Sequence, residues 1–146
     1  IHLKGLDILS KNILFLCTGN SCRSQMADGL AKKYLNNITI KSAGTKPEPV
    51  NPLAIQVMDE IGIDISKNKS KSFSDNDIKN ADYIITLCGN AKDTCIIDNR
   101  FKKKHLHWDI TDPAKARGSN EELLDVFRRT RDIIKKEIIS LEKDIQ

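Results

Sequence analysis

The stretch NILFLCTGNSCRSQMADGL, residues 12–30, constrains the fold more than any other part of the chain. It begins with a short apolar run typical of a buried strand and continues through a loop of small and polar residues. From Arg23 onward it has an amphipathic helical pattern. A strand that leads directly into a helix in this way favours a parallel sheet with helices packed on it.

The rest of the chain continues to alternate between strand-like and helix-like segments. Strand-like runs cover 38–44, 81–88 and, more weakly, 104–110, and helical patterns cover 23–35, 52–62 and 121–143. Asn51 is a good cap for a helix that has Pro52 at its first position. At least two strands are continuous apolar runs, so we expect an α/β fold of three layers, a four-stranded parallel sheet flanked by helices on both faces.

The loop after the first strand is suited to an anion held beside a thiolate. Its backbone N–H groups can point inward and the helix dipole adds to their field. Gly19 and Asn20 tolerate unusual backbone angles, and Arg23 supplies a planar fork for a tetrahedral oxyanion. In this field Cys17 should be largely thiolate at neutral pH, with Ser24 donating to its sulfur. The predicted oxyanion-binding residues are Thr18, Gly19, Asn20, Ser21, Cys22, Arg23 and Ser24.

We therefore interpret Cys17 as a nucleophile, and an inert buried thiol is the alternative. For Cys22 the preference is reversed: we predict a packing or reserve thiol, with a redox role as the alternative. The remaining cysteines are Cys88 and Cys95. The chain is not disulfide-dense and shows no export signal, which favours catalytic or metal-binding cysteines over structural disulfides.

Cys88 ends a strand-like run and Cys95 follows seven residues later. In a helix this spacing gives about 10 Å of rise, whereas bridged cysteines need Cα atoms roughly 4.4–6.8 Å apart. A disulfide would therefore require the segment to bend or unwind, and it contains poor helix formers. We interpret the pair as a mobile redox relay. The alternatives are two inert thiols or a zinc site with His105 and His107, which has no C-x-x-C pair to support it.

Length and composition indicate one domain. The chain has 146 residues, 39% hydrophobic and 30% charged, and a net charge of +4. We expect 12–146 to form a single catalytic domain and 1–11 to be an N-terminal extension whose order the sequence leaves open. The chain has no apolar run long enough for a membrane, no signal-peptide pattern and no interleaved basic and aromatic residues. We expect a cytoplasmic monomer that binds neither membrane nor nucleic acid.

CTGNSCRS resembles the phosphate-binding loop of low-molecular-weight protein tyrosine phosphatases and of the arsenate reductases that share their fold. The resemblance runs from about residue 12 to the C-terminus and includes SQMADG, SAGT, VNPLAI, IDIS and ITLC. Those phosphatases usually have proline where this chain has Gln25. The strand-end Cys88 and the later Cys95 match the thioredoxin-coupled reductases, so the resemblance implies a thioredoxin-coupled arsenate reductase with the low-molecular-weight phosphatase-like fold.

The general acid implied by the resemblance is Asp112, which lies in an Asp-Pro loop. Proline stiffens the loop and can hold a carboxylate in position. Asp109 is its nearest rival, and we expect His105, His107 and Trp108 to be strand and packing residues. Phosphatases of this fold commonly carry tyrosines after Asp-Pro. This chain continues AKARG, which favours a small free oxyanion over phosphotyrosine.

The resemblance also implies a reaction cycle. Cys17 attacks arsenate while Asp112 protonates the departing oxygen. Cys88 then attacks Cys17 and arsenite leaves, after which Cys95 attacks Cys88 and carries the disulfide outward to thioredoxin. No bound cofactor is expected, since thioredoxin supplies the reducing equivalents.

Some reductases of this family bind potassium beside the loop, and the matching side chains here are Asn20, Asp28 and Ser42. The next two ligands, a threonine and an aspartate, correspond to Lys69 and Lys71 by ungapped alignment. Two positively charged side chains at these positions argue against a bound potassium ion. Our hypothesis is that a lysine ammonium takes the place of the potassium.

Two other functions stay open. One is a low-molecular-weight phosphatase that hydrolyses phosphate monoesters, with Cys88 and Cys95 incidental. The other is a non-catalytic redox or anion sensor, for which a general acid would be unnecessary.

Overall fold

The computed structural model describes residues 11–87 and 104–145 of the chain. Within these residues one sheet is formed by β1 (Lys11–Cys17), β2 (Ile38–Gly44), β3 (Tyr83–Thr86) and β4 (His105–His107). All neighbouring strands are parallel, in the order β2-β1-β3-β4. The predicted four-stranded parallel sheet is therefore confirmed.

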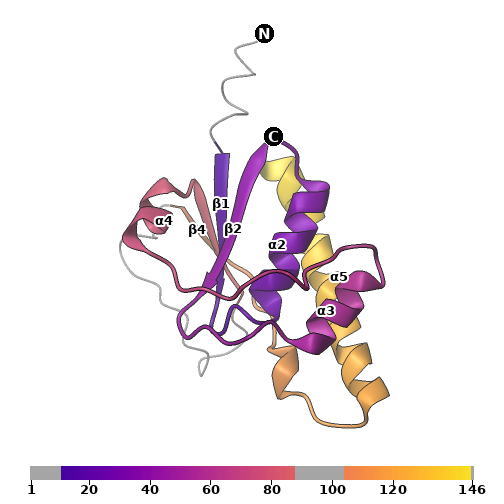
Figure 1. Ribbon diagram of the computed structural model, residues 1–146. Helices are drawn as coiled ribbons and strands as arrows, with labels where there is room; N and C mark the ends of the chain where they lie inside the picture. The colour runs from indigo at the N-terminus through magenta and orange to yellow at the C-terminus, as the bar shows by residue number, and fades with distance from the viewer. Residues whose placement is uncertain (1–10, 88–103, 146) are drawn as a thin grey trace.

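Helices cover both faces of this sheet (Figure 1). On one face lie α2 (Arg23–Tyr34), α3 (Pro52–Asp59) and the long α5 (Asn120–Ile145), packed against one another. On the other face lies the short α4 (Asp75–Asn80). A 3₁₀ turn, η1 (Pro113–Lys115), precedes α5. The three-layer arrangement is as expected from the alternating pattern.

The sequence of the central strand β1 is continuously apolar because both faces of the strand are buried. Ile13 and Phe15 belong to the core beneath α2 and α5, whereas Leu14 and Leu16 belong to a second, smaller core with Ile78 of α4. A strand buried on both faces needs apolar residues at successive positions rather than alternating ones.

The parallel register brings the ends of all strands to one edge of the sheet. Cys17 pairs with Gly44, and Thr86 pairs with Leu16 on one side and His107 on the other. The segments that follow the strands therefore meet at this edge, where ligands bind in open α/β sheets.

Several boundaries differ from the expected ones. Both later strands are shorter than the runs 81–88 and 104–110, although Trp108 N still donates to Thr86 O and so extends the ladder. Helix α3 ends at Asp59 and a turn follows, with Gly62 at φ +79°. That conformation suits glycine and ends a helix.

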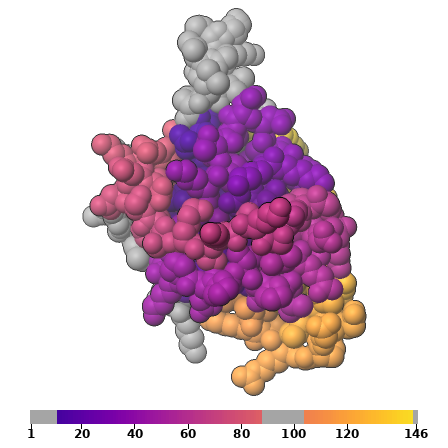
Figure 2. All heavy atoms as spheres, viewed as in Figure 1, coloured from indigo at the N-terminus to yellow at the C-terminus, as the bar shows by residue number. Residues whose placement is uncertain are grey.

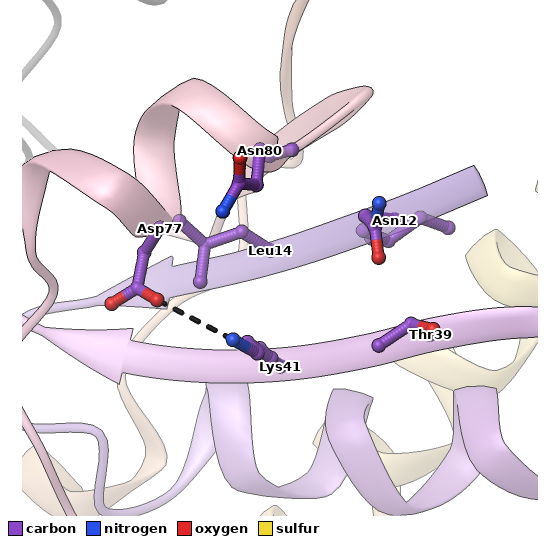
Figure 3. A pocket seen from close by; sticks show the side chains of 8 residues that line it. Asn12, Leu14, Thr39, Lys41, Asp77 and Asn80 are labelled. Carbon is purple, nitrogen blue, oxygen red and sulfur yellow. Dashed lines mark ion pairs between the residues drawn. The ribbon is translucent and has the colours of Figure 1, made fainter. Parts of the chain in front are cut away.

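Helix α4 was not predicted because six polar-rich residues carry no apolar period. It is held instead by a capping box, in which Ser74 and Asp77 bond to each other's backbone N–H. A small hollow of about 20 Å³ lies between α4 and the first two strands. Lys41 Nζ and Asp77 Oδ1, which lie 3.6 Å apart, form the ion pair drawn beside it in Figure 3. This space suits one water at most.

The two histidines of β4 lie on one side of the strand. His105 Nε2 and His107 Nδ1 are each 2.7 Å from Thr86 Oγ1. Trp108 packs against Phe15, with ring centroids 5.9 Å apart. Among the described residues no three His, Cys, Asp or Glu side chains form a group able to hold a metal, and no helix is long and apolar enough to cross a membrane.

Candidate active site

A pocket of about 330 Å³ lies where β1 ends. It is lined by Cys17, Thr18, Gly19, Ser21, Cys22, Arg23, Glu48, Asn51, Asp112, Ala114 and Lys115. Cys17 and Asp112, which are far apart in the sequence, therefore line one space. Cys88, which the sequence places at the end of a strand-like run, lies outside the described residues, as does Cys95.

The backbone of the loop 18–22 is held by the segment that follows β2. The carbonyl oxygens of Thr18, Gly19 and Ser21 accept from the N–H groups of residues 46, 48 and 51. A trans peptide points its N–H opposite to its carbonyl, and no peptide bond in the described residues is cis. The N–H groups next in line, at Gly19, Asn20 and Cys22, thus point away from that segment.

Helix α2 adds its N-terminus to the loop. Cys22 is the N-cap residue and makes no side-chain hydrogen bond to the first turn of the helix. An α-helix with such an N-terminus presents backbone N–H groups and the positive end of its dipole to an anion. In addition, Thr18 Oγ1 is buried in the pocket wall and has no hydrogen-bond partner within residues 11–87 and 104–145. The pocket therefore offers donors to an oxyanion.

A chain of hydrogen bonds leads to the sulfur of Cys17. Asn20 Nδ2 donates to Ser24 Oγ at 2.7 Å, and Ser24 Oγ lies 2.9 Å from Cys17 Sγ. Because an amide nitrogen can only donate, Ser24 accepts from Asn20 and keeps its single proton for the sulfur. A hydroxyl that donates to a thiolate favours the charged, nucleophilic form.

Arg23 is 2% exposed, and other parts of the protein hold its guanidinium in place. Its Nη1 donates to Ile110 O at 2.9 Å, and its Nη2 lies 3.6 Å from Asp112 Oδ2. Asp112 Oδ1 accepts from Ala114 N at 3.0 Å and so caps η1. The guanidinium and the carboxylate therefore form an ion pair in the pocket wall, while the rival Asp109 is exposed and does not line the pocket.

Cys22 is in a different environment from Cys17. Burial, followed by the nearby Asp112 carboxylate, raises the pKa of Cys22 to about 12. A thiol in such surroundings stays protonated at neutral pH and is a poor nucleophile. This supports the prediction that Cys22 is a packing or reserve thiol.

The residues matched to a potassium site are already hydrogen-bonded within the protein. Asn20 Oδ1 already accepts from Gln25 Nε2 at 3.1 Å and from Lys71 N at 3.0 Å, which uses both lone pairs. Asp28 Oδ2 accepts from Ser42 Oγ at 3.0 Å.

A lysine does compensate the Asp28 charge, but not one of the two we expected. Lys32 Nζ lies 2.8 Å from Asp28 Oδ1. The side chains of Lys69 and Lys71 are exposed, and Lys71 contributes its backbone N–H to Asn20. The pair Asp28 and Lys32 has i,i+4 spacing on α2, a signal that was available in the sequence.

Sequence reasoning missed four residues that line the pocket: Glu48, Asn51, Ala114 and Lys115. Asn51 was recognised only as the cap of α3, a role confirmed by its Oδ1 accepting from Leu53 N at 2.8 Å. Lys115 follows the Asp-Pro pair closely enough to have been suspected. No local pattern indicates Glu48, which reaches the pocket because its segment binds the loop backbone.

Comparison with known proteins is consistent with this geometry. Residues 12–146 match the family model described as low molecular weight phosphotyrosine protein phosphatase. A protein of Halalkalibacterium halodurans named arsenate reductase is 50% identical to this chain, over 88% of this chain and 92% of the relative. A protein of Bacillus subtilis with the same name is 47% identical, over 86% of this chain and 90% of the relative.

Solved structures with the same fold include two arsenate reductases and an arginine phosphatase. An arsenate reductase in the phosphate binding state has a TM-score of 0.76 at 31% identity, covering 93% of this chain and 99% of that one. A thioredoxin-dependent arsenate reductase from Corynebacterium glutamicum has a TM-score of 0.68 at 28% identity, and the match covers 93% of this chain and 62% of that one. An arginine phosphatase from Geobacillus stearothermophilus gives 0.76 at 29%, covering 93% of both. From its oxyanion loop to its C-terminus, the chain belongs to the low molecular weight phosphotyrosine protein phosphatase family.

Proposed function

We propose that this protein reduces arsenate to arsenite and that a thioredoxin-like dithiol protein restores it. The observation that carries the proposal is the pocket that joins Cys17, Arg23 and Asp112 in a chain 50% identical to a named arsenate reductase. The sequence adds Cys88 and Cys95, a pair that phosphate-ester hydrolysis does not need. In arsenic detoxification such a protein would act in the cytoplasm, where dithiol reductants are available.

In the first step arsenate occupies the pocket, bound by the loop N–H groups and by Arg23. The bond of Arg23 to Ile110 O fixes the plane of the guanidinium before the substrate arrives. Cys17 thiolate, supported by the Ser24 hydroxyl, forms a sulfur–arsenic bond. One arsenic–oxygen bond breaks, and Asp112 gives its proton to the oxygen, which leaves as water.

The two electrons that reduce arsenic come from thiols. Cys88 thiolate attacks Cys17 Sγ, the sulfur–arsenic bond breaks, and its electron pair stays on arsenic, so that arsenic(V) becomes arsenic(III) and arsenite leaves. Cys95 thiolate then attacks Cys88 and releases Cys17 as thiolate. The resulting Cys88–Cys95 disulfide is reduced by the dithiol protein. Each turnover consumes one dithiol and one arsenate.

The deciding experiment measures arsenite formed in the presence of thioredoxin, thioredoxin reductase and NADPH. The wild type should turn over many times, Cys88→Ser should stop before arsenite is released, and Cys95→Ser should complete about one turnover and accumulate a Cys17–Cys88 disulfide. Cys22→Ser serves as the matched control and should keep multiple turnover. Multiple turnovers by Cys95→Ser would contradict the relay, and no arsenite from the wild type would contradict the function.

A phosphatase is the second candidate, because an arginine phosphatase shares the fold at 29% identity and the thiolate, arginine and acid suit both reactions. Against it, the Asp-Pro turn continues without the aromatic residues that would flank phosphotyrosine. Hydrolysis of an aryl phosphate, measured beside the arsenite assay, separates the two. Failure of the reduced protein on both substrates would favour the sensor hypothesis.

A further inference from the structure

Gln25 is a buried polar residue that the reaction does not use. Its side chain is 1% exposed, although it lies in the first turn of α2, immediately after the loop. Gln25 Nε2 lies 3.1 Å from both Asn20 O and Asn20 Oδ1, and Gln25 Oε1 accepts from Asn68 Nδ2 at 3.0 Å. Its amide is therefore bonded on both ends.

Asn68 belongs to the crossing segment, residues 61–74, which connects α3 to α4 (Figure 1). Figure 2 shows this segment at the surface, lying across the purple atoms of the N-terminal part of the chain. Two more of its residues reach Asn20: Ser70 Oγ donates to Asn20 O at 2.7 Å, and Lys71 N donates to Asn20 Oδ1 at 3.0 Å. Gln25 and the crossing segment thus hold the same residue from two sides.

Asn20 needs this support because it is fully buried with φ +48°, a left-handed conformation in which non-glycine residues are uncommon. The orientation of its amide follows from partners of fixed chemistry. Lys71 N is a backbone donor, so the atom it meets must be Oδ1. Nδ2 therefore points to Ser24.

The orientation of the Asn20 amide determines the donor-to-acceptor direction of the hydrogen bonds that run through Ser24 to Cys17. With Nδ2 at Ser24 Oγ, the serine proton goes to Cys17 Sγ. If Asn20 turned its Oδ1 to Ser24, the serine would donate to the amide and the sulfur would lose its donor. Gln25 Nε2 bonds to Oδ1 and to the carbonyl of the same residue, and so opposes this rotation.

We propose that Gln25 is a positioning residue, which orients Asn20 so that the hydrogen bonds run from Asn20 through Ser24 to the Cys17 thiolate. The proposal rests on the proposed function only in taking Cys17 as the nucleophile. Its test requires neither arsenate nor thioredoxin, so that failure of either proposal can be told apart from failure of the other.

The test is the pH profile of Cys17 alkylation by iodoacetamide, resolved by mass spectrometry of the cysteine-containing peptides. Gln25→Met keeps the size of the side chain and removes both ends of the amide, and Gln25→Glu keeps the acceptor for Asn68 but removes the donor to Asn20. Both variants should shift the profile to higher pH and slow alkylation at neutral pH by about tenfold, the size expected for one hydrogen bond to a charged group. Gln56→Met, at an exposed position of α3, is the matched control and should have the wild-type profile.

A purely structural role would lower the melting temperature without moving the profile. If Gln25→Met folds and its profile is that of the wild type, the proposal is wrong. If Gln25→Met fails to fold, Asn68→Ala decides: it removes only the outer partner of Gln25 and should shift the profile in the same direction by a smaller amount. An unchanged profile in folded Asn68→Ala and Gln25→Glu would overturn the proposal.

Discussion

Arg23 Nη2 lies 3.6 Å from Asp112 Oδ2, and the arginine is buried whereas the aspartate side chain is 20% exposed. The pair joins the beginning of α2 to the turn before α5. The arginine is thus held in the interior, while the aspartate retains access to solvent, as the proposed general acid would need in order to regain its proton.

The first prediction concerns this carboxylate. Asp112→Asn should lower the single-turnover rate of arsenate consumption by about a hundredfold to ten-thousandfold, the usual contribution of a general acid. Asp109→Asn, an exposed neighbour outside the pocket, is the matched control and should react like the wild type. Rapid-quench measurement of arsenate bound to Cys17 gives the rate. Equal losses in both variants would show that Asp112 has no special role.

The second prediction concerns Gly44, which ends β2 against the loop. A Cβ there would lie 2.6 Å from Thr18 O and 2.7 Å from Asn20 N. Because these are backbone atoms, Gly44→Ala should displace the loop and abolish the rise in melting temperature that we expect sulfate or arsenate to cause in the wild type. Gly29→Ala is the control: its Cβ would lie 3.0 Å from Met58 and Ile63 in the core, which should cost about 1–3 kcal/mol but leave anion binding intact. Retained anion binding in Gly44→Ala would contradict the role of Gly44.

The third prediction is that potassium has no specific effect. Asn20 Oδ1 has two N–H donors and Lys32 offsets the charge of Asp28, so a potassium ion would have to displace these partners. The melting temperature and the rate of Cys17 alkylation should be equal in potassium, sodium and tetramethylammonium chloride at the same ionic strength. A melting temperature raised by potassium alone would show that the ion displaces these donors. In Lys32→Met the Asp28 charge is uncovered, and a cation effect is then expected.

The fourth prediction concerns the attachment of α3 to α5. Arg131 Nη1 donates to Val57 O at 2.8 Å and to Glu60 Oε1 at 2.9 Å, and the residue is buried. Arg131→Met leaves the Val57 carbonyl without this donor and should lower the free energy of unfolding by about 1–3 kcal/mol. Arg129→Met, exposed on the same helix, should change it by less than about 0.5 kcal/mol. Urea unfolding of both variants gives the comparison, and equal stabilities would refute the assignment.

The fifth prediction is a dependence of stability on pH through His105. Burial, and then the neighbouring His107, lower the pKa of His105 below its ordinary 6.5. Below pH 6.5 the unfolded chain therefore binds a proton that the folded protein resists, so stability should fall as the pH drops from 6.5 to the folded pKa.

His105→Gln tests this dependence. Thermal melts of the variant should show a smaller decline over that range, by about 2 °C or less, because the side chain is only partly buried. A decline identical to that of the wild type would assign it to other groups.

Much of the fold could be predicted because its signals are local. The apolar run at 12–17 is a strand buried on both faces, and Asn51 with Pro52 begins a helix, both as expected. Helix α4 was missed because it has no apolar period, although Ser74 three residues before Asp77 is a capping signal in the sequence. Cys17 ends one strand-like run and the Asp112 loop follows another. Their meeting at one edge of the sheet therefore follows from the rule that the carboxyl ends of parallel strands share an edge.

The sequence by itself determined which residues form the loop between β1 and α2, and it predicted for them the chemistry of a thiolate beside an arginine. Only the tertiary structure decided what surrounds them: Glu48, Asn51 and Lys115 in the pocket wall, Lys32 rather than Lys71 as the ammonium at Asp28, and Gln25 with the crossing segment behind Asn20. The physical reason is the sequence separation over which the two kinds of interaction act. Helix and strand preferences arise between residues a few positions apart, whereas the direction of a hydrogen bond to Cys17 depends on groups about fifty residues away that meet only when the sheet and its helices are packed.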